Sequence, residues 1–223
     1  GKVYGCGDNT YGELGQGDTT KRPYATQMKD SEGTGYISNI IDIASSEDEV
    51  TVLLDANGKV YGLGQNENGD FETSGDAYTL PKEITSLKNS IIVKSCLGVL
   101  CSIKANGDTY IRGINEYGAF GNGEAKTDGG LYKIGNDIND VCLYGYSSAL
   151  IKEDGTVWTS GRNHYGQLGL GDTTNRTTFK KVQYNGEDLK AKYVNGNGFA
   201  ITIVGKNNEL YFMGDNTYGQ STN

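Results

Sequence analysis

The sequence lacks the basic clusters and long apolar runs that nucleic-acid-binding and membrane-spanning chains need. Lysine and arginine total 20 against 28 aspartates and glutamates, a net charge of −8. Nucleic-acid phosphates are bound by grouped cations, and a membrane-spanning helix needs roughly 18 to 20 apolar residues in a row. We therefore expect no nucleic-acid partner and no membrane span.

Proline and cysteine are also scarce. Two prolines against 34 glycines exclude collagen-like and proline-rich linker structures. The four cysteines, Cys6, Cys96, Cys101 and Cys142, match no zinc-binding spacing. Cys96 and Cys101 are five positions apart, so on one strand they would face opposite sides and could not form a bridge. We expect buried free thiols.

What the chain does contain is a glycine-rich pattern that occurs five times, at intervals of about 50 residues. Each copy has an aromatic residue at one position and an Asn-x-x-Gly motif shortly after it. The copies start near positions 1, 58, 107, 155 and 208, and we interpret residues 1–223 as a single repeat domain. The aromatic residues, which we expect to face the packing between repeats, are Tyr4, Tyr61, Tyr110, Trp158 and Tyr211.

A tight β-hairpin is predicted before the aromatic position in four copies. Its turn pairs are Asn57–Gly58, Asn106–Gly107, Asp154–Gly155 and Asn207–Asn208. Such pairs suit a two-residue type I′ turn, because both residues tolerate positive φ. Further strands are predicted upstream, over 40–44, 91–95, 140–143 and 192–195. Three to four short strands per repeat, without helical periodicity, predict an all-β propeller in which each repeat is one blade.

The repeat resembles that of the regulator-of-chromosome-condensation family. Residues 155–172, GTVWTSGRNHYGQLGLGD, and residues 1–18 follow the family's unit closely, and the resemblance covers the whole chain. It implies a propeller that typically closes with seven blades. Four full repeats and part of a fifth would then be an excerpt of a larger ring, completed by further repeats or a second chain. The family's tryptophan and histidine positions are replaced throughout, which indicates a divergent branch.

Catalytic motifs are missing. The sequence contains no Walker loop, no nucleophile elbow and no calcium-loop spacing among its aspartates. Its one histidine, His164, occupies a loop position that the other copies fill with Thr or Glu, whereas a catalytic histidine needs a partner at definite geometry. We predict a protein that is not an enzyme and needs no cofactor or metal ion.

The 16 tyrosines point to binding, because tyrosine supplies a large, stiff, amphipathic contact surface. Four tyrosines of the Asn-x-x-Gly loops, together with His164, form the predicted partner-binding site: Tyr11, Tyr117, His164, Tyr165 and Tyr218. The simpler interpretation, which we favour on the sequence, is that each loop tyrosine packs on the neighbouring blade.

The predicted function is therefore a protein–protein interaction module that presents loops from one propeller face. An alternative is a structural or surface-display module of a larger extracellular bacterial protein. Abundant Asn, Lys, Ile and Tyr favour a bacterial origin, secreted or at the cell surface. The resemblance also implies guanine-nucleotide exchange on a small GTPase, but the acidic composition and the lack of a basic arm argue against it.

Overall fold

The computed structural model describes residues 1–67, 69, 71–72 and 75–221, which form β-strands, turns and one short 3₁₀ helix, η1 (Thr85–Leu87). Three antiparallel sheets have four strands each, and each is a simple meander in which consecutive strands pair. Their strands are β3 Ile40–Ser46, β4 Val50–Asp55, β5 Val60–Gly64 and β6 Tyr78–Glu83; β7 Ser90–Cys96, β8 Val99–Lys104, β9 Thr109–Gly113 and β10 Tyr132–Gly135; and β11 Ile138–Tyr144, β12 Ser147–Lys152, β13 Val157–Gly161 and β14 Arg176–Lys181. The predicted all-β blades are confirmed, and so are the strands predicted upstream of each hairpin.

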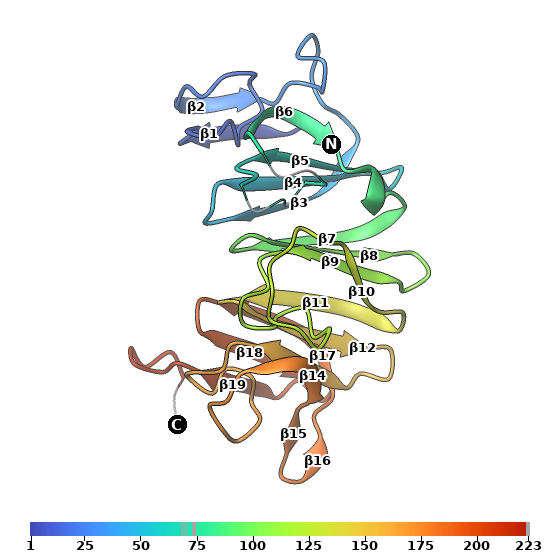
Figure 1. Ribbon diagram of the computed structural model, residues 1–223, viewed down its shortest axis with the longest axis vertical. Coiled ribbons are helices and arrows are strands. Elements are labelled where there is room, and N and C mark those ends of the chain that lie inside the picture. The colour runs from blue at the N-terminus through green and yellow to red at the C-terminus, as the bar shows by residue number, and fades with distance from the viewer. Residues whose placement is uncertain (68, 70, 73–74, 222–223) are drawn as a thin grey trace.

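Two smaller sheets lie at the ends of this series, and one hairpin projects from it. The first sheet pairs β1 Tyr4–Gly7 with β2 Arg22–Gln27, and the last sheet contains β17 Ala191–Asn197, β18 Ala200–Gly205 and β19 Leu210–Gly214. The hairpin of β15 Gln183–Tyr184 and β16 Glu187–Asp188 connects β14 to β17. Figure 1 shows the five sheets following one another in chain order along the longest axis, with the hairpin projecting at the lower end.

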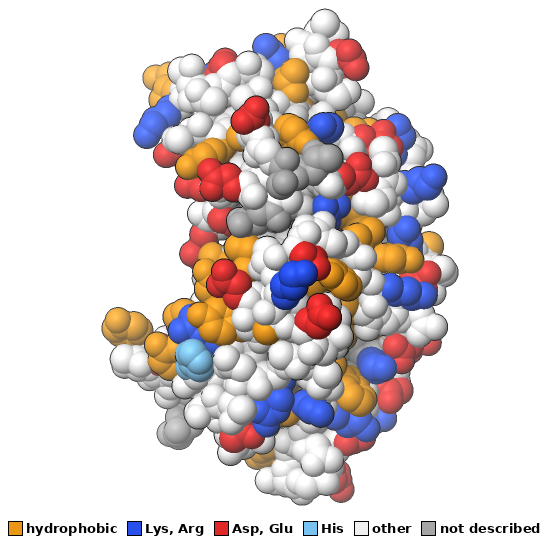
Figure 2. All heavy atoms as spheres, viewed as in Figure 1, with side chains coloured by type: hydrophobic (Ala, Val, Ile, Leu, Met, Phe, Trp, Pro, Cys, Tyr) orange, Lys and Arg blue, Asp and Glu red, His pale blue; other side chains and the backbone are white. Residues whose placement is uncertain are grey.

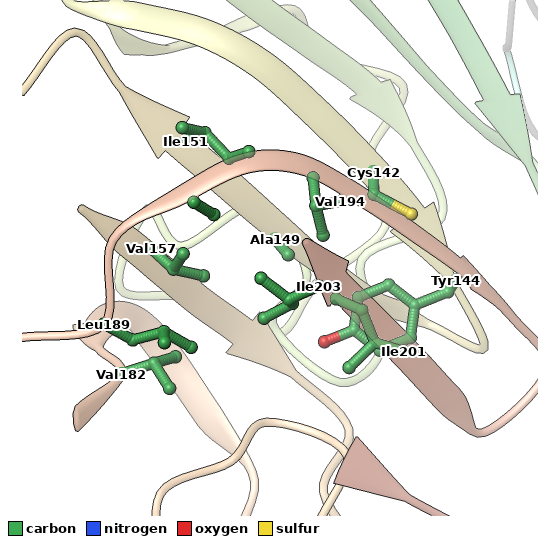
Figure 3. Close-up of a cluster of buried hydrophobic side chains, with 11 residues drawn as sticks. Cys142, Tyr144, Ala149, Ile151, Val157, Val182, Leu189, Val194, Ile201 and Ile203 are labelled. Atoms are coloured by element: carbon green, nitrogen blue, oxygen red, sulfur yellow. The ribbon is translucent and has the colours of Figure 1, made fainter. Parts of the chain in front are cut away.

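The sheets stack face to face in the manner of propeller blades. The first strands of neighbouring sheets lie side by side, β3 beside β7, β7 beside β11 and β11 beside β17. Each hydrophobic cluster fills the space between two successive sheets: Figure 3 shows Cys142 and Ala149 of one sheet packed with Val194 and Ile203 of the next. The second strands of the three four-stranded sheets, β4, β8 and β12, are covered on both faces, so nearly all of their residues are buried.

The predicted type I′ turns are wrong in detail. At the first hairpin Gly58 N donates to Asp55 O (3.0 Å) and Asp55 N donates to Lys59 O (2.9 Å), which encloses a three-residue loop. In the described backbone only the second residue of each predicted pair has positive φ: Gly58 (78°), Gly107 (81°), Gly155 (84°) and Asn208 (70°). This is a type I turn followed by a left-handed residue that forms a bulge, the commonest three-residue hairpin.

The repeated aromatic position faces the packing between blades, with one exception. Tyr61, Tyr110, Trp158 and Tyr211 are half-buried against the inter-sheet clusters. Tyr4 is 55% exposed, because the other four pack against the cluster shared with the preceding sheet, and within the described residues no sheet precedes the one that contains Tyr4.

The expectation of buried free thiols is confirmed for two of the four cysteines. All four cysteines are free, and Cys101 and Cys142 are buried, but Cys6 is exposed and Cys96 is half-buried. Cys96 and Cys101 lie on neighbouring strands, not on one strand, because Leu97 and Gly98 form the turn between β7 and β8. Within the described residues, no helix is long and apolar enough to cross a bilayer.

Candidate functional site

The Asn-x-x-Gly loop of the fourth blade is held together by one buried side chain. Asn163, with no exposed surface, donates from Nδ2 to the carbonyl oxygens of Asp172 (2.9 Å) and Thr174 (3.1 Å). Its Oδ1 accepts a hydrogen bond from Leu168 N at 2.9 Å. Burying these groups in mutual hydrogen bonds avoids the cost of leaving them unpaired, so the loop keeps one shape without any regular secondary structure.

The same asparagine braces the other loops. Asn9 binds the carbonyl oxygens of Asp18 and Thr20 and the backbone N–H of Leu14. The Oδ1 atoms of Asn66 and Asn115 likewise accept the backbone N–H five residues further on. The repeated asparagine is therefore architectural, whereas the positions beside it vary from blade to blade.

Two of the loop tyrosines pack against aromatic residues of the following strand turn. The Tyr117 ring, after β9, lies 5.4 Å from the ring of Tyr146, in the turn between β11 and β12. The Tyr165 ring, after β13, stacks on Phe199, in the turn between β17 and β18, with centroids 5.0 Å apart and planes 25° apart. Each pair joins one blade to the next, as the simpler interpretation of these tyrosines expects.

Arg162 connects the two pairs. Its guanidinium carbon lies 5.2 Å from the centre of the Tyr117 ring and 4.7 Å from that of Phe199, both within cation–π range. Its Nε donates to Nδ1 of His164 (3.3 Å), and the His164 ring meets Tyr117 edge-on at 6.1 Å. We call this set the Arg162 cluster: Tyr117, Tyr146, Arg162, His164, Tyr165 and Phe199.

The cluster forms part of the protein surface. His164 and Tyr165 are exposed, Tyr165 by 46%, and the other four members are half-buried. Figure 2 shows the pale blue histidine among orange and blue side chains at the left edge of the molecule, below a region of red side chains. Three consecutive sheets contribute members: Tyr117 from the sheet of β7 to β10, Phe199 from the sheet of β17 to β19, and the rest from the sheet between them.

The structure brings together three of the five residues in the predicted site, Tyr117, His164 and Tyr165. Among the described residues, Tyr11 and Tyr218 have no ring contact with them. The turn that corresponds to Tyr146 and Phe199 carries Glu49 in the blade that follows Tyr11, so no aromatic partner is available there. Tyr218 is 88% exposed.

Sequence reasoning missed Arg162, Tyr146 and Phe199. A signal for Arg162 exists, because the position before the repeated asparagine is Asp8, Gln65, Ile114, Arg162 and Asp215 in the five copies. Tyr146 and Phe199 stand directly before the second strand of their blades, where the other blades have Glu49 and Gly98. Comparing these two positions across the copies would have singled out the fourth and fifth blades.

The braced loops and the stacked four-stranded sheets agree with the comparison to known families. The model of the regulator of chromosome condensation (RCC1) repeat matches residues 1–53 and 154–192, and a second model of this repeat matches residues 138–167. The chain belongs to the RCC1-repeat family.

Relatives of this RCC1-repeat chain include the ultraviolet-B receptor UVR8 of Arabidopsis thaliana, 28% identical over 94% of the chain and 48% of the receptor. The probable E3 ubiquitin-protein ligase HERC4 of Homo sapiens is 30% identical over 84% of the chain and 19% of the ligase. Among solved structures, yeast RCC1 (Prp20) bound to Kap60 superposes with a TM-score of 0.80 at 17% identity, covering 97% of the chain and 52% of Prp20. Human WBSCR16 superposes with a TM-score of 0.77 at 17% identity, covering 96% of the chain and 57% of WBSCR16.

The RCC1-repeat chain thus spans about half or less of the curated relatives it matches. These relatives come from a plant, a mammal and a yeast, and they give no support to the expectation of a bacterial, secreted protein.

A second surface feature is a cleft of about 680 Å³ between the β15–β16 hairpin and the turn after β18. The rings of Tyr184 and Tyr211 line it, in edge contact at 5.1 Å. Its lysines, Lys190 and Lys206, both donate to the backbone carbonyl of Asp154. Since these cations already bind the chain itself, the Arg162 cluster is the stronger candidate for recognition.

Proposed function

We propose that this RCC1-repeat chain is a non-enzymatic protein-interaction module that binds a partner protein through the Arg162 cluster. The observation that carries the proposal is one continuous surface of aromatic rings around a single arginine. Tyrosine and arginine are enriched among the residues that dominate binding energy at protein interfaces. The rings are also held by contacts across three sheets, so little conformational freedom is lost when a partner binds.

The relatives support binding as the mode of action. Yeast Prp20 has been solved in complex with Kap60, and a second structural study concerns its binding to Gsp1p and histones. Within the described residues, no group of three or more His, Cys, Asp and Glu side chains could hold a metal ion.

Affinity capture with three folded baits tests the proposal. The native chain is compared with a His164→Ala/Tyr165→Ala variant, which removes the two exposed members of the cluster. The matched control is Tyr24→Ala/Tyr36→Ala, since these tyrosines are 82% and 61% exposed and lie in the first blade and the segment after it, outside the cluster. We expect a partner that binds the native and control baits and is lost from the cluster variant.

Equal capture by all three folded baits would place the binding surface elsewhere and contradict the proposal. Absence of any specific partner on the native bait would contradict the interaction function itself. Circular dichroism and thermal unfolding of each bait establish beforehand that all three are folded.

A further inference from the structure

We propose that the Arg162 guanidinium binds a carboxylate of the partner, so that the module recognises an aspartate or glutamate next to an apolar residue. This inference rests on the proposed function, because it assumes that the Arg162 cluster is the binding surface. It adds the chemical class of the group that is recognised.

The geometry of Arg162 suits a carboxylate. A guanidinium has two faces, which suit aromatic rings, and a forked edge of N–H donors, which suits a carboxylate. Here the rings of Tyr117 and Phe199 pack around the group, and Nε is engaged by His164. Within the described part of the chain, the two terminal nitrogens of Arg162 have neither a hydrogen-bond acceptor nor an ion-pair partner. The terminal N–H groups of Arg162, which would donate to a carboxylate, are therefore held in place and available.

The other three arginines of the sequence differ from Arg162 in what they bind. Arg22 binds the Asp18 carboxylate, and Arg176 binds that of Asp172 in the equivalent loop. Arg112 is buried and donates to the carbonyl oxygens of Gly69 and Gly129. Each of these guanidinium groups binds acceptors of its own chain and stabilises a loop, whereas the fork of Arg162 is left for an acceptor from outside.

The charge of the cluster also favours a carboxylate. Arg162 is the one cation of the cluster, which otherwise consists of four aromatic rings and a histidine whose Nδ1 acts as an acceptor. One cation matches one carboxylate, whereas phosphate groups are bound by several grouped cations. The surrounding rings exclude water from the ion pair and offer contact area to an apolar neighbour of the carboxylate, which strengthens the pair.

The test starts from a random linear peptide library displayed on phage and selected on the native chain. The selected peptides are synthesised, and their affinities are measured by fluorescence anisotropy for the native chain, Arg162→Gln, Arg162→Lys and His164→Ala/Tyr165→Ala. Arg22→Gln serves as the matched control, because Arg22 pairs with an aspartate of its own loop. We expect peptides with Asp or Glu beside an apolar residue and a loss of at least tenfold in affinity for Arg162→Gln. Arg22→Gln should bind like the native chain.

A double-mutant cycle separates recognition from a structural role of Arg162. Changing the peptide's acidic residue to its amide should weaken binding to the native chain as much as Arg162→Gln does, and should cause no further loss on that variant. Added salt should weaken binding to the native chain but have little effect on Arg162→Gln. The peptide affinity of Arg162→Lys should lie between those of the native chain and Arg162→Gln, because lysine keeps the charge but lacks the planar fork.

The outcomes distinguish this inference from the proposed function. If His164→Ala/Tyr165→Ala abolishes peptide binding while Arg162→Gln does not, or if the two losses in the cycle simply add, the surface is correct and the carboxylate inference is wrong. If peptides bind all variants equally, or if none can be selected, both are wrong.

Discussion

The ring of Tyr165 stacks on the ring of Phe199, with centroids 5.0 Å apart, although the two residues belong to successive sheets. The guanidinium of Arg162 lies against the same phenylalanine at 4.7 Å. A contact that a partner would use is thus also a contact that joins two blades. Binding and stability must therefore be measured separately for substitutions in the cluster.

Removing the Tyr165 ring should lower stability modestly. We expect Tyr165→Ala to reduce the free energy of unfolding by about 0.5–1.5 kcal/mol, the range for an aromatic pair. Tyr165→Phe should be neutral, because the hydroxyl makes no hydrogen bond within the described residues. Urea unfolding followed by circular dichroism measures both variants, and equal losses would show that the ring contact is not the stabilising feature.

Removing the buried asparagine that holds a loop together should lower the free energy of unfolding more than removing the Tyr165 ring does. Asn163→Ala leaves the N–H of Leu168 and the carbonyl oxygens of Asp172 and Thr174 without their partner. At about 1–3 kcal/mol for each buried unpaired group, we expect a total loss of about 3 kcal/mol or more. Asn216 makes the same kind of bond to Ser221 N but is exposed, so Asn216→Ala should cost no more than about 0.5 kcal/mol. Similar unfolding midpoints for the two variants would argue against burial as the cause.

The turn between β11 and β12 touches the turn between β17 and β18 of the next sheet through glycine. Gly145 has a φ of 44°, and a Cβ atom there would meet the carbonyl oxygen of Gly198 in the next sheet. Gly186, in the β15–β16 hairpin, has a φ of 82° but no neighbour within 4 Å of such an atom. Gly186→Ala should therefore show conformational strain alone, about 1 kcal/mol, and Gly145→Ala should lose about 1–3 kcal/mol more from the steric clash. Thermal unfolding measures both variants, and equal decreases in their unfolding temperatures would indicate that the blades do not touch at Gly145.

Of the four cysteines, one should react quickly with a thiol reagent. Burial raises the pKa of Cys96 to about 11 and that of Cys142 to about 12, and it also raises the pKa of Cys101, so at pH 8 these thiols remain protonated and inert. Cys6 is exposed. Labelling of the native chain at pH 8 should therefore give one fast adduct by mass spectrometry, absent in Cys6→Ser, and four after denaturation. A second fast adduct would show that another cysteine becomes accessible in the folded chain.

The repeat and the short strands can be predicted from the residue pattern alone, and the spacing of the Asn-x-x-Gly motif explains the loops. These features follow from local chemistry: alternating apolar residues define strands, and an asparagine that satisfies three backbone groups defines its loop wherever the spacing recurs. For that reason the upstream strands and the family were correctly predicted from a single chain. The hairpin turns were misjudged because an Asn-Gly pair fits both a two-residue turn and the bulged three-residue loop that the strand register selects.

Which variable side chains meet depends on how the blades pack and cannot be predicted from one repeat. Tyr117 and Tyr146 are separated by most of a blade in sequence, and so are Tyr165 and Phe199, yet the stacking of sheets places each pair in contact. The same repeat pattern brings Tyr11 to a blade whose turn carries Glu49, and no aromatic pair forms there. The pattern within one repeat is a property of neighbouring residues, whereas the Arg162 cluster depends on the packing of three repeats against one another. The repeat pattern is sufficient to predict the strands of each blade. The packing of the blades determines which of the variable side chains lie together at the surface.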